Sequence, residues 1–308
     1  MKIKSLIVGL GQIGLGYDFN DLTDEFVATH AKALHLHPDF DLIGGVDSAE
    51  DRREMFAKRY GKAIFENVAC ALENCRPELV ILATPIWDHA ETFRELLKFP
   101  DLRLILCEKP FAARLEDAEK MLESAQKRNI KVAINYVRRY DPGVQSLMSR
   151  LCSGEMGVPL KGCVWFSKGI YNNGSHFINL FVDILGVVKE IKIISSGRLW
   201  DRWDPEPDFK LTFESGVIYF ISVPEENFSY NQVEILGPKG KVLFEKNGQI
   251  FCCGITADAR FDGYTSLRET TEEIPTDLHR YQYNVLQNLS DFLSGRASLV
   301  CDGESGLR

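Results

Sequence analysis

Short apolar runs alternate with amphipathic segments along the first 137 residues. Five runs have the length and apolar content of strands: residues 2–8, 41–47, 79–84, 102–107 and 131–136. Three segments between them repeat apolar side chains at helical spacing: residues 29–36, 88–97 and 115–128. Nearly continuous apolar strands that alternate with helices are typical of a parallel sheet covered on both faces. We therefore expect an α/β Rossmann domain with a doubly wound parallel sheet.

The pattern changes after about residue 141. One short helix is expected from His176, and strand-like runs then dominate: residues 191–199, 209–213, 217–223, 232–236 and 241–244. Turn residues join neighbouring runs at 214–216 and 238–240, and residues 278–293 predict a late amphipathic helix. We therefore expect an α+β C-terminal domain with a large, mostly antiparallel open sheet, and we place the domains at residues 1–137 and 138–308.

Composition narrows the class of protein. The 308 residues suffice for two domains, and the 45% hydrophobic and 26% charged content is that of a globular chain. A net charge of -8 and the lack of a basic run argue against nucleic-acid binding. No apolar run approaches the roughly 18 residues of a membrane span, so no membrane is expected. The eight cysteines lack zinc-type spacing, which favours reduced thiols, a cytoplasmic location and no metal.

A glycine-rich turn follows the first predicted strand. Gly9, Gly11 and Gly14, with Gln12 and Ile13 between them, form the G-x-G-x-x-G fingerprint. These glycines let the backbone turn sharply and approach a pyrophosphate, whose charge is met by the N-terminus of the helix that the turn is expected to open. The sequence therefore predicts a dinucleotide site. A glycine turn in a Rossmann-like fold that binds no dinucleotide stays open as an alternative.

Asp47 ends the second predicted strand, where a carboxylate can accept hydrogen bonds from a ribose. It lies 33 positions after Gly14, whereas about 20 are expected. The polar, turn-rich residues Leu15–Phe26 are therefore interpreted as a loop inserted beside the phosphate site. Because a carboxylate repels a 2′-phosphate, NAD is expected in preference to NADP.

Three further motifs carry a family resemblance: Cys107-Glu108-Lys109-Pro110, Ala83-Thr84-Pro85 with His89 four residues later, and the run from Asn135 to Pro142. In this order and spacing, nearly the whole chain resembles the Gfo/Idh/MocA family, the glucose-fructose oxidoreductase and inositol dehydrogenase type. The resemblance implies an NAD(P)-dependent oxidoreductase with a Rossmann domain and a substrate-binding sheet domain. It extends the expected cofactor site, which comprises Gly9, Gly11, Gln12, Ile13, Gly14, Asp47, Thr84, Pro85, His89, Glu108, Lys109 and Pro110. A role at a helix start is the alternative for His89.

The resemblance also indicates catalytic residues. Lys109 is expected at the carboxyl end of a parallel strand, where ligands of open sheets bind, and its ammonium can stabilise charge on a substrate oxygen. His176 fills the position of the family's general acid/base. Asn172 and Asn179 stand where relatives carry carboxylates, so Asn172 is a catalytic candidate with a changed role. Tyr171 as proton donor, and His176 as a packing residue, remain alternatives.

The expected reaction is hydride transfer between nicotinamide and a hydroxyl or carbonyl carbon of a sugar, nucleotide-sugar or cyclitol. Six residues are expected to bind this polyhydroxylated substrate: Lys109, Arg138, Tyr171, Asn172, Asn173 and His176. Two alternatives remain, a non-catalytic member of the fold that senses cofactor or ligand, and a dehydrogenase of non-sugar carbonyls. The family resemblance also implies a homodimer or homotetramer formed through the C-terminal sheet.

Overall fold

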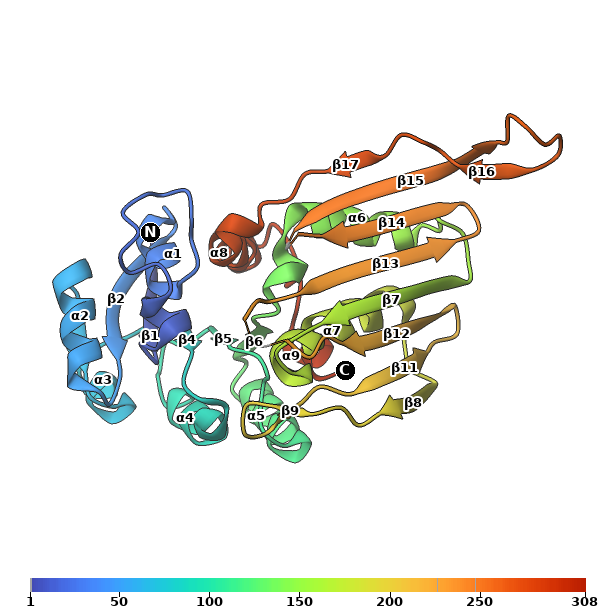
Figure 1. Cartoon of the computed structure of the whole chain (residues 1–308). Helices are drawn as coiled ribbons and strands as arrows, with labels where there is room; N and C mark the ends of the chain where they lie inside the picture. The colour runs from blue at the N-terminus through green and yellow to red at the C-terminus, as the bar shows by residue number, and fades with distance from the viewer. Residues whose placement is uncertain (1, 226, 247) are drawn as a thin grey trace. The chain divides into compact units, whose positions relative to one another are not determined.

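The computed structural model describes residues 2–225, 227–246 and 248–308, and these residues form two compact units (Figure 1). The first unit comprises residues 1–140 and 279–308, and the second comprises residues 141–278. The expected boundaries were 1–137 and 138–308. The difference lies mainly at the C-terminal end, because residues 279–308 pack with the first unit.

The first unit contains a six-stranded parallel sheet in the order β3-β2-β1-β4-β5-β6. Its strands are β1 (Ile3–Val8), β2 (Phe40–Val46), β3 (Ala63–Phe65), β4 (Leu79–Leu82), β5 (Leu104–Cys107) and β6 (Lys131–Ile134). Its α-helices are α1 (His30–Leu36), α2 (Glu50–Tyr60), α3 (Val68–Asn74), α4 (His89–Leu96), α5 (Leu115–Lys127), α8 (Tyr281–Leu293) and α9 (Gly303–Leu307). Strands β4 and β5 are buried along their whole length, as strands covered on both faces must be. The expected doubly wound Rossmann sheet is confirmed.

The C-terminal segment completes this unit. Helix α8 buries Val285, Leu286 and Leu289 in the same core as the parallel sheet. Beyond it, the backbone N–H of Ile134 in β6 donates to the carbonyl of Cys301 at 2.9 Å. The apolar face of an amphipathic helix can pack against either unit. The position of α8 in the sequence therefore did not show which unit it joins.

The glycine fingerprint opens a different element from the expected helix. Residues Gln12–Gly16 form a single π-helical turn, and α1 begins only at His30. The inserted loop between them is fixed at its base by Asp18, a buried carboxylate. Asp18 accepts hydrogen bonds from the N–H groups of Ala28 and Thr29 and from the Thr29 hydroxyl, at 2.5–2.9 Å. The insertion therefore has a defined anchor.

The second unit is built on a nine-stranded sheet in the order β16-β15-β14-β13-β7-β12-β11-β8, with β17 paired to β15. Its strands are β7 (Leu160–Phe166), β8 (Glu190–Ser195), β11 (Asp208–Thr212), β12 (Gly216–Ser222), β13 (Asn231–Gly237), β14 (Gly240–Glu245), β15 (Gln249–Ala257), β16 (Thr265–Leu267) and β17 (Glu272–Ile274). Only the β7–β12 pair is parallel among the described pairs. The expected large, mostly antiparallel sheet is confirmed.

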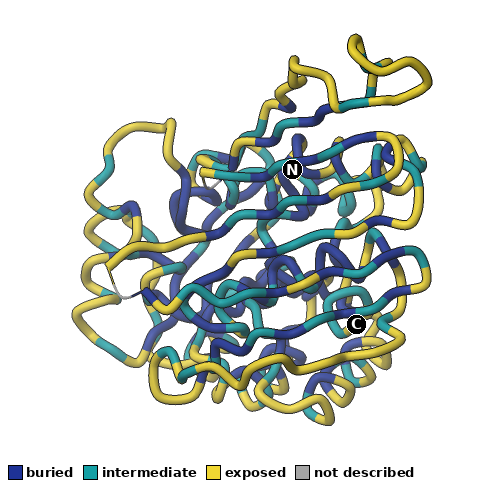
Figure 2. The backbone as a smooth tube through the Cα atoms, turned by 45° about the vertical axis from the view of Figure 1, so that its right-hand side comes forward, coloured by how far each residue is buried: buried dark blue, intermediate teal, exposed yellow. Residues whose placement is uncertain are grey.

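Helices α6 (Pro142–Cys152) and α7 (Ser175–Leu185) share a core with one face of this sheet. Along the strands, buried residues alternate with more exposed ones, so the other face is open (Figure 2). Trp165 and Tyr219 are exposed there. The strand expected at residues 191–199 is interrupted: β8 ends at Ser195, and Leu199 begins the small β9 (Leu199–Trp200) and β10 (Asp204–Pro205) hairpin. In the described part of the chain, no helix is long and apolar enough to cross a bilayer.

Candidate functional site

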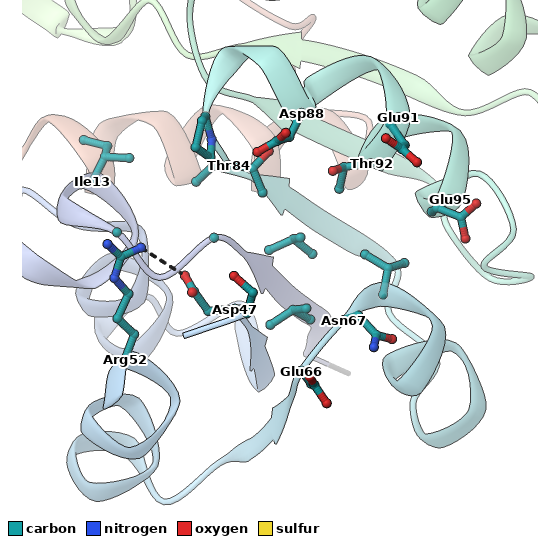
Figure 3. A pocket seen from close by; sticks show the side chains of 18 of the residues that line it. Ile13, Asp47, Arg52, Glu66, Asn67, Thr84, Asp88, Glu91, Thr92 and Glu95 are labelled. Atoms are coloured by element: carbon teal, nitrogen blue, oxygen red, sulfur yellow. Dashed lines mark ion pairs between the residues drawn. The ribbon is translucent and has the colours of Figure 1, made fainter. Parts of the chain in front are cut away.

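A pocket of about 790 Å³ lies in the first unit, at the carboxyl ends of β1, β2 and β4 (Figure 3). Ligands of open α/β sheets bind at this edge, and the volume lies within the range of small-molecule sites. The lining includes seven residues that the sequence predicted: Gly9, Gly11, Gln12, Ile13, Asp47, Thr84 and Pro85. Gly14, His89, Glu108, Lys109 and Pro110 are not among its lining residues.

The three glycines serve different purposes. Gly9 has φ +103°, and a side chain there would meet the Ala83 carbonyl at 2.4 Å. A side chain at Gly14 would meet the Gly9 carbonyl at 2.1 Å, so both positions are closed by packing. At Gly11 the nearest atom would be 3.9 Å away, on Arg52. A side chain at Gly11 would thus occupy only the pocket, which is where a pyrophosphate must approach the backbone.

Asp47 is held at the end of β2 by backbone groups. Its carboxylate accepts hydrogen bonds from the N–H groups of Leu10 at 2.8 Å and Ala49 at 2.9 Å. The Arg52 guanidinium lies 3.6 Å from the same carboxylate (Figure 3). A carboxylate has about four acceptor positions, so Asp47 keeps capacity for ribose hydroxyls. The geometry therefore suits the role that the sequence predicted for it.

The charge of the pocket favours a cofactor without an additional phosphate. Arg52 is the one basic side chain in the lining, which also includes five carboxylates: Asp47, Glu66, Asp88, Glu91 and Glu95. Thr84 adds a polar group, because its buried Oγ1 has no hydrogen-bond partner among the described residues. A buried hydroxyl of this kind fits a polar ligand. The open space at Gly11, the spare acceptor positions of Asp47 and the Thr84 hydroxyl together fit NAD.

His89 and Glu108 are buried and do not line the pocket. The ring nitrogens of buried His89 are 2.9 Å from the Thr84 carbonyl and 3.0 Å from the Phe111 carbonyl. His89 thus fixes the segment that carries Thr84. Glu108 accepts hydrogen bonds from Asn135 at 2.6 Å and pairs with His30 at 2.8 Å. Burial raises the pKa of Glu108, but His30, Asn135 and the charge of Lys109 outweigh it and hold the pKa below its usual range.

Lys109 and Pro110 are half-buried and lie two and three residues after the end of β5, at the carboxyl end of that strand. The backbone N–H of Lys109 donates to Glu108 at 3.2 Å. Arg138 lies in the 3₁₀ turn Val137–Tyr140 after β6. Burial lowers the pKa of Arg138 to about 10, so its guanidinium stays charged at neutral pH.

The remaining candidates form one segment of the second unit. Tyr171, Asn172 and Asn173 lie in the π-helical turn Ile170–Gly174, and buried His176 is the second residue of α7. The Asn173 amide donates to the Ser167 carbonyl at 2.7 Å. The ring of Tyr171 contacts that of Trp203, with 5.5 Å between centroids. Asn179 is buried within α7, so the structure places all these residues on one turn and the helix after it.

Sequence reasoning missed three buried residues at these sites. His30 belongs to none of the sequence motifs, yet it pairs with Glu108 next to Lys109. Asp204 and Glu206 accept backbone hydrogen bonds from the turn that carries Tyr171 and Asn172. The second pair lies in the alternating run Asp-Pro-Glu-Pro-Asp at residues 204–208, which by itself indicates only an extended acidic segment. Among the described residues, no group of three His, Cys, Asp or Glu side chains is arranged to hold a metal.

Comparison with known proteins shows which family of enzymes the first unit resembles. Residues 3–136 match the Gfo/Idh/MocA model, described as an oxidoreductase family with an NAD-binding Rossmann fold. The inositol 2-dehydrogenase of Rubrobacter xylanophilus is 32% identical over 133 residues, which are 42% of this chain and 38% of that protein. The glucose-6-phosphate 3-dehydrogenase of Bacillus subtilis is 32% identical over 139 residues, 45% of this chain and 39% of that protein. The matches thus cover less than two thirds of these relatives.

Solved structures extend the likeness over the whole chain. The WlbA dehydrogenase from Bordetella pertussis, in complex with NADH and UDP-GlcNAcA, has a TM-score of 0.77 at 18% identity. The match covers 99% of this chain and 92% of that one. A putative myo-inositol dehydrogenase from Sinorhizobium meliloti has a TM-score of 0.75 at 17% identity, over 99% and 93% of the two chains. At these identities the likeness concerns the fold, and it includes the second unit.

Proposed function

Because residues 3–136 match the model of the Gfo/Idh/MocA oxidoreductase family, we propose that this chain is an NAD-dependent dehydrogenase or reductase of that family. Its substrate would be a sugar, nucleotide-sugar or cyclitol, the compounds that the relatives' names indicate. The nicotinamide, when bound, supplies or accepts the hydride at the substrate's CH–OH or carbonyl carbon. The observation that carries this proposal is the pocket in which Gly11, Asp47 and Thr84 fit a dinucleotide.

NAD is the proposed cofactor in preference to NADP. A 2′-phosphate would approach the Asp47 carboxylate in a pocket lined by five carboxylates and one arginine. Like charges at short range disfavour binding, and the cost grows where water is excluded. The positive charge of Arg52 is partly neutralised by Asp47 before any ligand binds, so it offers little attraction to a 2′-phosphate.

Lys109 is the proposed catalytic group of the first unit. It follows β5 at the carboxyl edge of the sheet, next to ionised Glu108. An ammonium there can donate a hydrogen bond to the reacting oxygen and stabilise the negative charge that develops on it. Arg138, which stays charged at neutral pH, is the proposed partner for substrate hydroxyls or phosphate.

His176 is the proposed general acid/base in the second unit, with Tyr171, Asn172 and Asn173 as substrate-binding groups. An imidazole can take the hydroxyl proton during oxidation and return it during reduction. Asn172 offers an amide where the family resemblance implies a carboxylate, so it supplies hydrogen bonds without charge. A member of the fold that binds cofactor without turnover is the second candidate, and these amides are the observation that favours it.

The proposal also includes an oligomeric state and a cellular location. The open face of the large sheet exposes Trp165, Tyr219 and Leu236, and apolar surface of this kind marks interfaces. We propose a homodimer or homotetramer formed through that face. We also propose a cytoplasmic location, which the eight free cysteine thiols support.

Lys109→Ala tests the catalytic proposal. We expect the NADH dissociation constant to change little, because the pocket lining does not include Lys109. Turnover should fall by roughly a hundredfold or more, as for the loss of a proton-transfer or oxyanion group. The substrates to assay are myo-inositol, glucose 6-phosphate and UDP-sugars. NADH binding without turnover on any substrate would favour the sensing role, and a variant with normal turnover would exclude Lys109 from catalysis.

A further inference from the structure

A short acidic segment of the second unit contacts the turn that carries the substrate candidates. Residues 204–208 read Asp-Pro-Glu-Pro-Asp, so three carboxylates alternate with two prolines. Proline fixes φ near the extended range and removes backbone donors, and alternate side chains of an extended segment share one direction. Asp204 and Glu206 are each only 1% exposed. Two adjacent carboxylates of one segment are therefore buried together.

These two carboxylates bind the backbone of the neighbouring turn. Asp204 accepts from the N–H groups of Tyr171 and Asn172, with both donor–acceptor distances 2.9 Å. Glu206 accepts from the N–H groups of Lys168 at 2.7 Å and Gly169 at 3.3 Å. Hydrogen bonds to an ionised acceptor are about twice as strong as neutral ones. Four backbone groups within five residues are thus held by two buried carboxylates, which we call the carboxylate clamp.

The backbone around the clamp is adapted to it. Gly169 has φ +85°, and a side chain there would lie 2.0 Å from an Asp204 carboxylate oxygen. Gly197 has φ +65°, and a side chain there would meet the Glu206 carbonyl. Lys168 adopts φ +62°, which costs energy for a residue with a side chain. The turn is therefore held in a conformation that it would not adopt unaided.

Burying the clamp is costly unless its charge is compensated. Arg198 provides part of this compensation, because its Nε lies 2.7 Å from Glu206. The same guanidinium donates to the Glu225 carbonyl at 2.7 Å. Trp203, next to Asp204 in sequence, also places its ring against Tyr171. Arg198 thus contributes a charge to the clamp, and the hairpin Leu199–Pro205 contributes an aromatic surface to the turn.

We propose that Asp204 and Glu206 are positioning residues for the substrate. They fix the turn Lys168–Asn172 and thereby the directions of Tyr171 and Asn172, the groups assigned to substrate binding, at the entry to the helix that carries His176. This inference rests on the proposed dehydrogenase function. A displacement of about 1 Å in such groups is enough to slow a reaction substantially, which is why strained turns are held rigidly at binding sites.

Asp204→Asn tests the clamp with little change in size. An amide can still accept one hydrogen bond through its oxygen, but its NH2 group faces the second backbone N–H. We expect kcat/KM to fall by roughly tenfold to a hundredfold, with an unchanged NADH dissociation constant. Hydrogen exchange of the Tyr171 and Asn172 amides should become at least roughly tenfold faster. A tenfold loss of protection from exchange corresponds to the weakening of about one hydrogen bond.

Asp208→Asn is the matched control. Asp208 belongs to the same segment, but its carboxylate accepts from the Ser222 N–H at 2.8 Å and the Ser222 hydroxyl at 3.0 Å. Both bonds end on Oδ1, which the amide of the variant retains, so Asp208→Asn should leave kcat/KM and exchange of the Lys168–Asn172 turn unchanged. Equal kinetic losses in the two variants, or unchanged exchange in Asp204→Asn, would overturn the proposal. Absence of turnover in the unmodified protein would instead refute the dehydrogenase function, while the exchange experiment would still decide whether the clamp holds the turn.

Discussion

At the scale of single residues, Asp47 illustrates how a specificity determinant is prepared before a ligand arrives. Two backbone N–H groups orient its carboxylate toward the pocket. Asp47→Ser should remove both the acceptor for ribose hydroxyls and the charge that opposes a 2′-phosphate, and Arg52 would then be available to that phosphate. We expect the preference for NADH over NADPH to fall by roughly tenfold, the equivalent of one to two hydrogen bonds.

Fluorescence titration of both cofactors measures this preference. Asp51→Ser is a suitable control, because Asp51 is an exposed acid of α2 outside the pocket lining. Its preference should equal that of the unmodified protein. Equal affinities for NADH and NADPH before any substitution would contradict the role of Asp47.

His176 and Asn172 provide a second test at this scale. A carboxylate at position 172 would stabilise a protonated imidazole, as the amide cannot. If His176 exchanges the substrate proton, Asn172→Asp should move the pH dependence of alcohol oxidation to higher pH, because oxidation requires the neutral ring as base. His176→Ala should abolish that dependence in both backgrounds. Profiles that stay unchanged in both variants would make His176 a packing residue.

At the scale of elements, the inserted loop Leu15–Phe26 depends on one carboxylate. Asp18→Ala would leave three donors of Ala28 and Thr29 without their acceptor in a buried position. We expect the free energy of unfolding to fall by roughly 1–3 kcal/mol. Because neighbouring Tyr17 lines the cofactor pocket, NADH should also bind more weakly. Denaturant unfolding and NADH titration measure the two effects.

Asp24→Ala is the control for this change. Asp24 lies in the same loop, but it is exposed to water. It should alter unfolding and NADH affinity less than Asp18→Ala does. The reverse order would show that the loop is not anchored at its base.

The elements that the sequence predicted are those whose burial leaves a regular pattern. Strands β4 and β5 are entirely apolar because both their faces are covered, and β12 alternates because one face is open. Helix α2 was missed for the opposite reason, since Phe56 is its only buried residue and its other positions carry no apolar stripe. The prediction of a helix directly after the glycine fingerprint was wrong, because the inserted loop leaves only one helical turn there.

The candidate site divides in the same way. Backbone-driven features such as Gly9, Gly11 and Asp47 are recognisable because their spacing follows the strand and turn that hold them. The clamp and the His30–Glu108 pair join residues far apart in the chain. Their partners depend on tertiary packing, so no local pattern could have named them. The alternation of acids and prolines at residues 204–208 indicated only an extended acidic segment.

At the scale of the whole molecule, the open sheet face is the surface to test for assembly. Trp165 and Tyr219 lie on the adjacent strands β7 and β12, and the register pairs Tyr219 with Cys163, two residues from Trp165. Their side chains therefore share the open face. Tyr219→Arg should shift the protein toward monomer in analytical ultracentrifugation, since a charge at the core of an interface is costly. Thermal stability of the monomer should remain close to that of the unmodified protein.

Leu115→Arg provides the comparison for that experiment. Leu115 is exposed, but it begins α5 in the first unit. Its sedimentation should match that of the unmodified protein. Monomers before any substitution, or an unchanged oligomer in Tyr219→Arg, would contradict assembly through the sheet.

Because the first unit is built from two separate segments of the chain, it also determines the order in which the units fold during synthesis on the ribosome. Residues 1–140 leave the ribosome before residues 141–278, but the core that they begin is completed by Leu286 and Leu289, which leave after the second unit. Residues 141–278 are continuous and can fold as soon as they emerge, since domains generally fold as units during translation. The first unit therefore begins to fold before the second unit but completes its core after it. While the second unit folds, the incomplete Rossmann sheet of the nascent chain is exposed to aggregation.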